Sequence, residues 1–193
     1  MAIGFKEWAL VCEALVAGKT SLIIRKGGIA EGREGFRFKH VDFVLLPTLF
    51  HEQLAKTRLP AETILPVLEE GKITITARAT VEWTQLITNR VILQKLEPYH
   101  ILQPSVVEDR FVYDPKPGQI PQPDGVNVAF LRIWKATRPW TFPDAPKYGG
   151  CRSWIELPDL PENITWTPIL TDSEHAALNA ELRAHTKLTS FSS

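Results

Sequence analysis

The segment from Lys72 to Trp83 places the strongest constraint on the fold, because its side chains alternate in polarity over many positions. In KITITARATVEW every second residue from Ile73 to Trp83 is apolar, and the residues between them are polar or charged. Since successive side chains of a β-strand point to opposite faces, the pattern predicts a long strand with one buried face. Strands of this kind are typical of antiparallel sheets.

Other segments predict further strands and helices. Apolar residues at helical spacing predict a helix over Ile3–Ala17, and Thr171 and Glu174 predict a capping box that opens a terminal helix at about 171–187. Further strands are expected at 20–26, 36–48, 105–113, 126–137 and 152–157, short helices at 48–56, 61–70 and 89–96, and loops at 114–125 and 138–151.

The order of these elements indicates an α+β fold. Strands outnumber helices and do not alternate with long helices, which argues against a doubly wound parallel sheet. We therefore predict a mixed, mostly antiparallel β-barrel with flanking helices and a C-terminal helix. Residues 1–157 are expected to form a single α+β domain, with 158–193 as a C-terminal extension packed on it.

Charge is balanced over the chain but unevenly placed. The 193 residues include 22 Lys and Arg and 22 Asp and Glu, so no global field attracts polyanions. Between Lys19 and His40, however, six basic residues face two acidic ones, whereas 158–181 holds five acidic residues and no Lys or Arg. The six are Lys19, Arg25, Lys26, Arg33, Arg37 and Lys39.

The sequence gives no sign of export or of a bound cofactor. The N-terminal residues lack a basic region followed by an apolar core, and no apolar run approaches the roughly 18 residues of a membrane span. Cys12 and Cys151 are too few for a metal site or a disulfide framework, and the histidines show no metal-ligand spacing. We expect a cytoplasmic protein without cofactor or metal.

The glycine-rich stretch RKGGIAEGREGF, residues 25–36, does not match a nucleotide-binding loop. A phosphate-binding loop ending in Gly18-Lys19-Thr20 needs a glycine five residues earlier, where this chain has Glu13. The glycines also lack dinucleotide spacing, and no helix opens after them. The stretch therefore predicts a connection between two strands, with Arg25, Lys26, Arg33 and Arg37 forming a basic rim that contacts phosphates by charge.

A second basic stretch, Arg132–Trp154, interleaves five basic residues with five aromatic ones. Aromatic rings beside guanidinium groups are suited to stacking an unpaired base while holding its backbone. Trp134 and Trp154 are expected in the core of their strands, and Trp140 and Tyr148 on exposed loop. The predicted nucleic-acid-binding residues are Arg25, Lys26, Arg33, Arg37, Arg138, Trp140, Tyr148 and Arg152. The hypothesis requires both basic stretches to converge on one face.

Two other functions fit parts of the sequence. One type of metal-dependent nuclease uses a carboxylate followed later in the chain by Glu-x-Lys. Asp42 and Glu70-Gly71-Lys72 have a similar spacing, and Glu13 lies on the preceding helix. His51 beside Glu52 offers a general base. Alternatively, the acidic C-terminal region docks a protein partner.

Three blocks in order, FKEWALVCEAL, LIIRKGGI and FVLLPTLFHEQ, resemble a bacterial family known as domain of unknown function 1802. The resemblance covers most of the chain. The resemblance assigns no activity to the chain, and it implies an association with restriction–modification genes.

A second resemblance is to the PUA-like barrels, which include the ASCH and EVE domains. It rests on a helix ending in Gly18-Lys19-Thr20, a strand with Arg25, and Asp42 leading into FVLL. It implies a PUA-like fold that binds RNA or modified DNA bases, or a small hydrolase using Lys19, Glu13 or His51. Apolar Leu22 and Ile23 stand where the ASCH pattern has an acidic residue.

Overall fold

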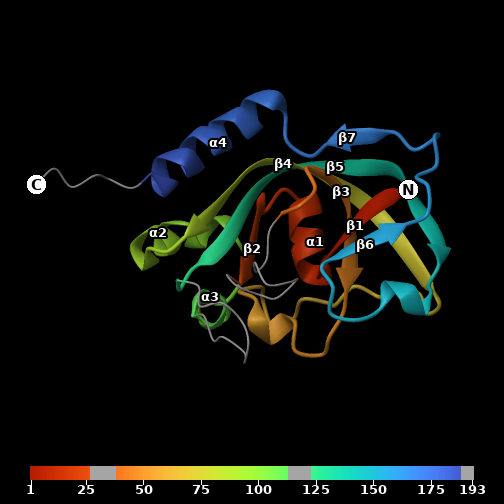
Figure 1. Cartoon of the computed structure of the whole chain (residues 1–193), viewed down its shortest axis with the longest axis horizontal. Helices are drawn as coiled ribbons and strands as arrows, with labels where there is room; N and C mark the ends of the chain where they lie inside the picture. Colours follow the sequence, from red (N-terminus) through yellow and green to blue (C-terminus); the bar gives the residue numbers. More distant parts are fainter. Residues whose placement is uncertain (27–37, 113–122, 188–193) are drawn as a thin grey trace, which may run out of the picture.

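The computed structural model describes residues 1–26, 38–112 and 123–187, and its centre is one seven-stranded sheet (Figure 1). The path runs β2-β5-β4-β3-β1-β6, with β7 paired to β5. The strands are β1 Ala2–Trp8, β2 Leu22–Lys26, β3 Asp42–Thr48, β4 Lys72–Ile87, β5 Val126–Pro143, β6 Trp154–Leu157 and β7 Trp166–Pro168. The helices are α1 Ala9–Val16, α2 Arg90–Lys95, α3 Pro104–Phe111 and α4 Asp172–Thr186, with short 3₁₀ turns at Leu54–Lys56, Glu97–Tyr99 and Pro146–Tyr148.

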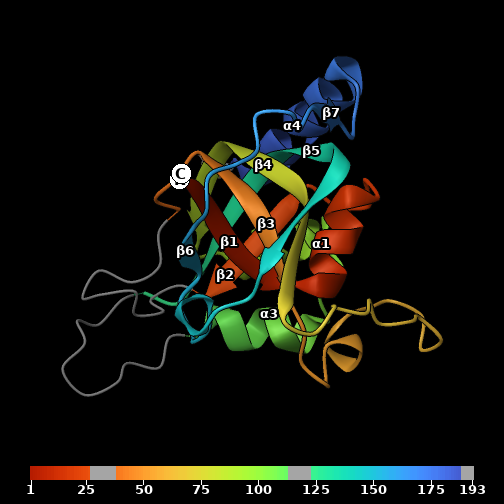
Figure 2. The ribbon, with the colours of Figure 1, turned by 90° about the vertical axis from the view of Figure 1, so that its right-hand side faces the viewer.

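The expected mixed, mostly antiparallel sheet with flanking helices and a C-terminal helix is confirmed. Only β1 and β3 pair in parallel among the described strands. The predicted barrel is not closed by backbone pairing, because β2 and β6 end the described path of the sheet. Figure 2 shows α3 near one end of the sheet and α4 near the other. No helix in the described ranges is long and apolar enough to span a bilayer.

The long strand predicted from alternation is present and pairs with β5 along most of its length. The register runs from Lys72 opposite Pro143 to Ile87 opposite Val126, with shifts at two irregularities. The first irregularity places three extra residues on β5 and the second places one extra residue on β4, and an odd number of extra residues inverts the alternation. Ile75 consequently belongs to one core and Ala77 to the other.

The two faces of the sheet are buried against different layers. On β3, Phe43 and Leu45 join the larger core, which also contains residues of α1, α2 and α3. Their neighbours Val44 and Leu46 point the other way, into a second core with Ile155 and Leu157. Residues of 160–166 cover this second core. We call the face that carries the larger core the inner face, and the face that carries the second core the outer face.

The predicted helix over Ile3–Ala17 is wrong in its first half. Residues 2–8 form β1, which pairs with β3 on one side and β6 on the other, and the helix begins only at Ala9. The apolar positions fit both periods over so short a segment, and pairing with two neighbouring strands decided between them.

Three further local predictions are wrong. Where a strand was expected over 105–113, Pro104–Phe111 form helix α3, and Pro104 at its first turn is a helix-start signal that the β-branched residues obscured. Residues 61–70 form no helix, since Pro66 interrupts an exposed segment. Residues 138–143 continue β5 instead of forming a loop, because Pro139 lies at an irregularity of the β4–β5 register.

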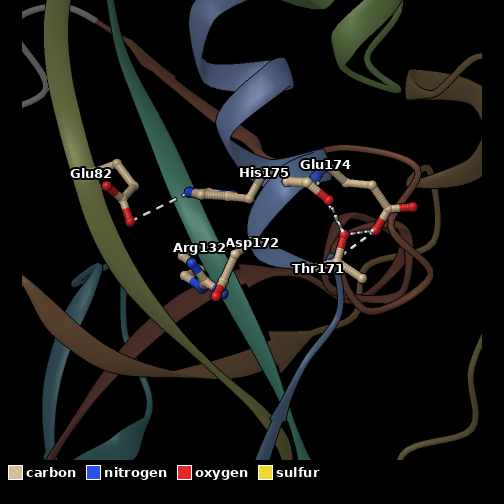
Figure 3. Close-up of polar contacts among 7 residues, drawn as sticks. Glu82, Arg132, Thr171, Asp172, Glu174 and His175 are labelled. Carbon is tan, nitrogen blue, oxygen red and sulfur yellow. Dashed lines mark hydrogen bonds and ion pairs between the residues drawn. The ribbon is translucent and has the colours of Figure 1, made fainter.

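The predicted capping box at the start of α4 is confirmed (Figure 3). The hydroxyl oxygen of Thr171 accepts the Glu174 N–H at 3.3 Å, and the Glu174 carboxylate accepts the Thr171 N–H at 2.8 Å. Next to it, Asp172 pairs with Arg132 of β5, and His175 lies 3.4 Å from Glu82 of β4. These contacts hold the N-terminus of α4 to strands β4 and β5.

We expect Thr171→Ala to lower the free energy of unfolding by about 1 kcal/mol, because the first turn of α4 loses an acceptor for a backbone N–H. Urea denaturation measures the change. Ser173→Ala is the control, since this hydroxyl caps no backbone N–H in the described structure, and its effect should stay within about 0.5 kcal/mol. Equal losses in both variants would contradict the assigned role.

Candidate nucleic-acid interface

Arg25 joins two strands that are not neighbours in the path of the sheet. Its guanidinium donates to the carbonyl oxygen of Lys6 on β1 and lies 3.3 Å from the Glu7 carboxylate. The same guanidinium lies over the ring of Phe5, 4.7 Å from the centroid. Glu7 is only 2% exposed and also accepts the Trp8 N–H at 2.7 Å. Arg25 therefore brings β2 beside β1 where backbone pairing does not.

A second layer of buried polar groups supports this junction from α3. Arg110 donates to the Ile24 carbonyl oxygen of β2 at 2.5 Å and lies over the Trp8 ring. Burial lowers the pKa of Arg110 to about 10, so the side chain still carries its charge at neutral pH. Burial, reinforced by the Arg58 and Arg110 guanidiniums, lowers the pKa of His100 to about 3.

The buried polar cluster is structural and offers no ligand site. The cavity that Glu7, Thr20, His100 and Arg110 line has a volume of only about 10 Å³. This space is about that of one water molecule. The cluster consequently commits Arg25, a predicted phosphate contact, to holding β1 and β2 together.

Trp140 and Tyr148 are not exposed, which corrects the prediction for both. Trp140 is 6% exposed and Tyr148 is 5% exposed, and both lie in the outer core with Phe142. The reason is the continuation of β5, which gives Trp140 and Phe142 the alternation of a strand. The Phe142 ring lies between the two, 4.7 Å from the Trp140 ring at a tilt of 41° and 5.8 Å from the Tyr148 ring, so the buried Trp140 and Tyr148 rings cannot stack a base in this conformation.

The two basic stretches meet at Trp154. The rings of Phe38 and His40, from the first stretch, lie 6.3 and 5.0 Å from the Trp154 ring of the second. Trp154 is half-buried and packs its inner side against Phe5 and Phe43. The end of the first stretch, at Phe38 and His40, therefore lies against the second stretch at Trp154, which the sequence assigned to the core, and the convergence of the predicted basic residues stays a prediction.

Cations without a carboxylate partner surround this junction. Within the described residues, Lys39, Lys147 and Arg152 form no ion pair, and all three are exposed. Lys147 lies over the Tyr148 ring at 4.9 Å. We define the Trp154 patch as Lys39, His40, Lys147, Arg152 and Trp154.

A surface groove of about 640 Å³ runs beside Trp154, lined by Lys147, Arg152 and residues of β6. Its acidic members are Glu156 and Asp159, and Asp159 pairs with the N-terminal ammonium of Met1. The larger groove, of about 780 Å³ near 67–74, has Glu69, Glu70 and Asp144 in its lining. Of these two grooves, the one beside Trp154 is better suited to a polyanion.

The remaining predicted residues are scattered or lie outside the described ranges. Lys26 is half-buried at the end of β2, and Arg138 is exposed on β5. Arg33 and Arg37 fall within 27–37, outside the described residues. Sequence reasoning missed Lys39, His40, Lys147 and Trp154 as a group, because no local pattern shows that residues about 115 positions apart touch.

The metal-nuclease arrangement does not assemble. Asp42 pairs across the sheet with Thr80, while Lys72 lies eight residues earlier on the same strand, roughly 25 Å away. Over the described ranges, no group of three or more His, Cys, Asp or Glu side chains could hold a metal ion.

Nor do the other proposed functional groups form a catalytic arrangement. Glu13, Lys19 and His51 are all exposed, and the described contacts include no hydrogen bond or ion pair among them.

Four of the five acidic residues of 158–181 make ion pairs or hydrogen bonds with other residues of the chain. Asp159 pairs with Met1, Asp172 with Arg132, and Glu174 caps α4. Glu181 accepts a hydrogen bond from the Tyr99 hydroxyl at 2.6 Å. These carboxylates attach the region to the sheet and its neighbours.

Comparison with known proteins gives a family and two distant structures. The model of a family described as "Domain of unknown function (DUF1802)" matches residues 4–181. A search of the curated proteins finds no match. A crystal structure of ASCH from Zymomonas mobilis is 13% identical with a TM-score of 0.40, covering 92% of this chain and 93% of that one.

The crystal structure of a mutant ZmASCH protein from the same organism is 12% identical with a TM-score of 0.41, covering 92% and 94%. Both carry the ASCH name of the second sequence resemblance. Likeness at this level does not identify a shared site or activity.

We expect Arg25→Met to lower the free energy of unfolding by about 3 kcal/mol, since it leaves the Glu7 carboxylate buried without its cation. Adding Glu7→Gln should restore part of the loss, so the double variant is more stable than the sum of the single effects. Urea denaturation of the four proteins measures this coupling. Strict additivity would contradict the pairing, and Lys26→Met is the control on the same strand.

The low pKa of His100 predicts a loss of stability in acid. The unfolded chain binds a proton near its ordinary pKa of about 6.5, whereas the folded chain resists protonation down to about 3. The free energy of unfolding should therefore fall as pH drops through this window. His100→Asn keeps an acceptor for the Leu102 N–H and should flatten the profile, whereas exposed His51→Asn should not. An unchanged slope in His100→Asn would contradict the assignment.

Proposed function

Because the chain belongs to the family described as Domain of unknown function (DUF1802), whose description assigns no activity, we propose a function from its surface: the protein binds nucleic acid at the Trp154 patch. In this proposal Lys39, Lys147 and Arg152 contact backbone phosphates, and Trp154 with His40 offers an aromatic surface to a base.

The contact between His40 and Trp154 carries the proposal. It joins two basic stretches that lie far apart in the chain, at ring centroids 5.0 Å apart. Without this contact the basic residues would be ordinary solvated charges, since the whole chain has a formal net charge of zero. A local concentration of unpaired cations beside an aromatic ring attracts a polyanion even where the net charge does not.

The aromatic component favours unpaired nucleotides over duplex. A base that stacks on a protein ring must first leave its own stack, and this costs least in single strands. Trp154 is anchored on its inner side by Phe5 and Phe43, so the indole loses little conformational freedom when a base contacts it. RNA, single-stranded DNA and duplexes with modified bases are therefore the ligand classes to compare.

The experiment is fluorescence anisotropy with labelled oligonucleotides of each class over a range of salt concentrations. We expect binding to single strands, with affinity falling steeply as salt rises. The double variant Lys147→Gln/Arg152→Gln should weaken binding and reduce the salt slope by about 1.4, or about 0.7 for each lost phosphate contact. Trp154→Ala should weaken binding roughly tenfold at constant salt slope.

Lys95→Gln is the matched control, because it removes an exposed cation from α2, which lies at the opposite end of the molecule from β6 (Figure 1). Absent or salt-independent binding, or equal losses in the control, would overturn the proposal. Preferential binding of methylated DNA would connect the protein with restriction–modification, and preference for RNA would point to RNA metabolism.

A further inference from the structure

The outer face of the sheet carries an arginine, Arg78 of β4, whose guanidinium contacts two indole rings. The guanidinium carbon lies 5.1 Å from the centroid of Trp134 on β5 and 5.4 Å from that of Trp166 on β7. All three side chains are half-buried. Contacts of this kind fix the plane of a guanidinium and leave its donor edge available.

Arg78 has no counter-charge among the described residues. No carboxylate oxygen there lies within 4.0 Å of its nitrogens, and no hydrogen bond from its guanidinium is found. Arg132 makes a useful comparison, since its guanidinium lies over the same Trp134 ring at 5.0 Å but pairs with Asp172 (Figure 3). Of the two guanidiniums that lie over the Trp134 ring, that of Arg132 is paired with Asp172, and that of Arg78 has no acidic partner among the described residues.

Three buried N–H donors without an acceptor lie together at this place. They are Nε of Arg78, Nε of Arg132 and Nε1 of Trp134. Arg78 and Trp134 are direct partners in the β4–β5 register, and Arg132 lies two positions along β5 on the same face. These three atoms are shielded from solvent, whereas the terminal nitrogens of Arg78, Nη1 and Nη2, are not among the shielded atoms and make no hydrogen bond or ion pair with the described residues. The terminal nitrogens are therefore the donors that an anion can reach.

We propose that Arg78 binds a phosphate group through its terminal nitrogens on the outer face of the sheet. A guanidinium presents two parallel N–H donors that match two oxygens of a phosphate. The indole rings hold it in place before the ligand arrives, which reduces the entropy lost on binding.

This site is separate from the Trp154 patch. Arg78 lies opposite Val44 in the β3–β4 register, and Val44 belongs to the outer core. Trp154 packs on Phe43, the next residue along β3, which points to the inner face. The phosphate comes either from a small free ligand or from a nucleic-acid backbone that extends around the sheet, and the experiment distinguishes these sources.

Isothermal titration calorimetry with inorganic phosphate, against chloride at equal ionic strength, tests the site. The wild-type chain should bind phosphate, and Arg78→Met should lose at least tenfold in affinity. Arg78→Lys keeps the charge and a long stem over the rings but loses the paired donors, so it should also weaken binding and covers the case in which Arg78→Met does not fold. Exposed Lys95→Gln on α2 is the control and should bind as wild type.

Parallel titrations with a single-stranded oligonucleotide identify the source of the phosphate. Loss of both ligands in Arg78→Lys assigns the site to a nucleic-acid backbone, and loss of inorganic phosphate alone assigns it to a small ligand. Absent phosphate binding by the wild type, or unchanged binding by folded Arg78→Met or by Arg78→Lys, would overturn the proposal. The Lys147→Gln/Arg152→Gln variant should bind inorganic phosphate normally, because it leaves Arg78 unchanged. Failure of the proposal for Arg78 can therefore be distinguished from failure of the proposal for the Trp154 patch.

Discussion

The buried pair of Glu7 and Arg25 is the interaction on which the rest of the architecture depends. Strands β1 and β2 are not neighbours in the sheet, yet Arg25 reaches the Lys6 carbonyl oxygen and the Glu7 carboxylate on β1. Both strands contribute to the inner core, β1 through Phe5 and β2 through Leu22, Ile23 and Ile24. A buried pair is costly to desolvate, and its contribution is to specify which strands meet, because either partner alone would be an uncompensated charge.

The same junction positions the Trp154 patch. Phe5 lies under the Arg25 guanidinium and beside the Trp154 ring, so the ion pair and the aromatic cluster share one residue. The outer face is organised differently, since Arg78 and Arg132 lie over indole rings and, within the part of the chain that the structure describes, Arg132 alone of the two pairs with an acid. One sheet thus presents two arrangements of cations and aromatic rings, on opposite faces.

Local patterns in the sequence predicted the elements that depend on local contacts. The alternation of 72–83 predicted β4, and Thr171 with Glu174 predicted the start of α4, because strand periodicity and capping involve residues close in the chain. The same reasoning failed at Ala2–Trp8 and at 138–143. At Ala2–Trp8, pairing with β3 and β6 overrode a helical spacing, and at 138–143 pairing with β4 overrode a proline.

The features of the candidate sites also divide into those that local sequence predicts and those that depend on contacts between distant segments. The sequence by itself determined the fold class, the family and the presence of two basic stretches with aromatic residues among them. Only the tertiary structure decided that Trp140 and Tyr148 are buried, that His40 meets Trp154, and that Arg78 contacts two indoles and pairs with no acid among the described residues. The physical reason is that exposure and charge compensation depend on which distant segments pack together, and residue type and local spacing do not carry that information.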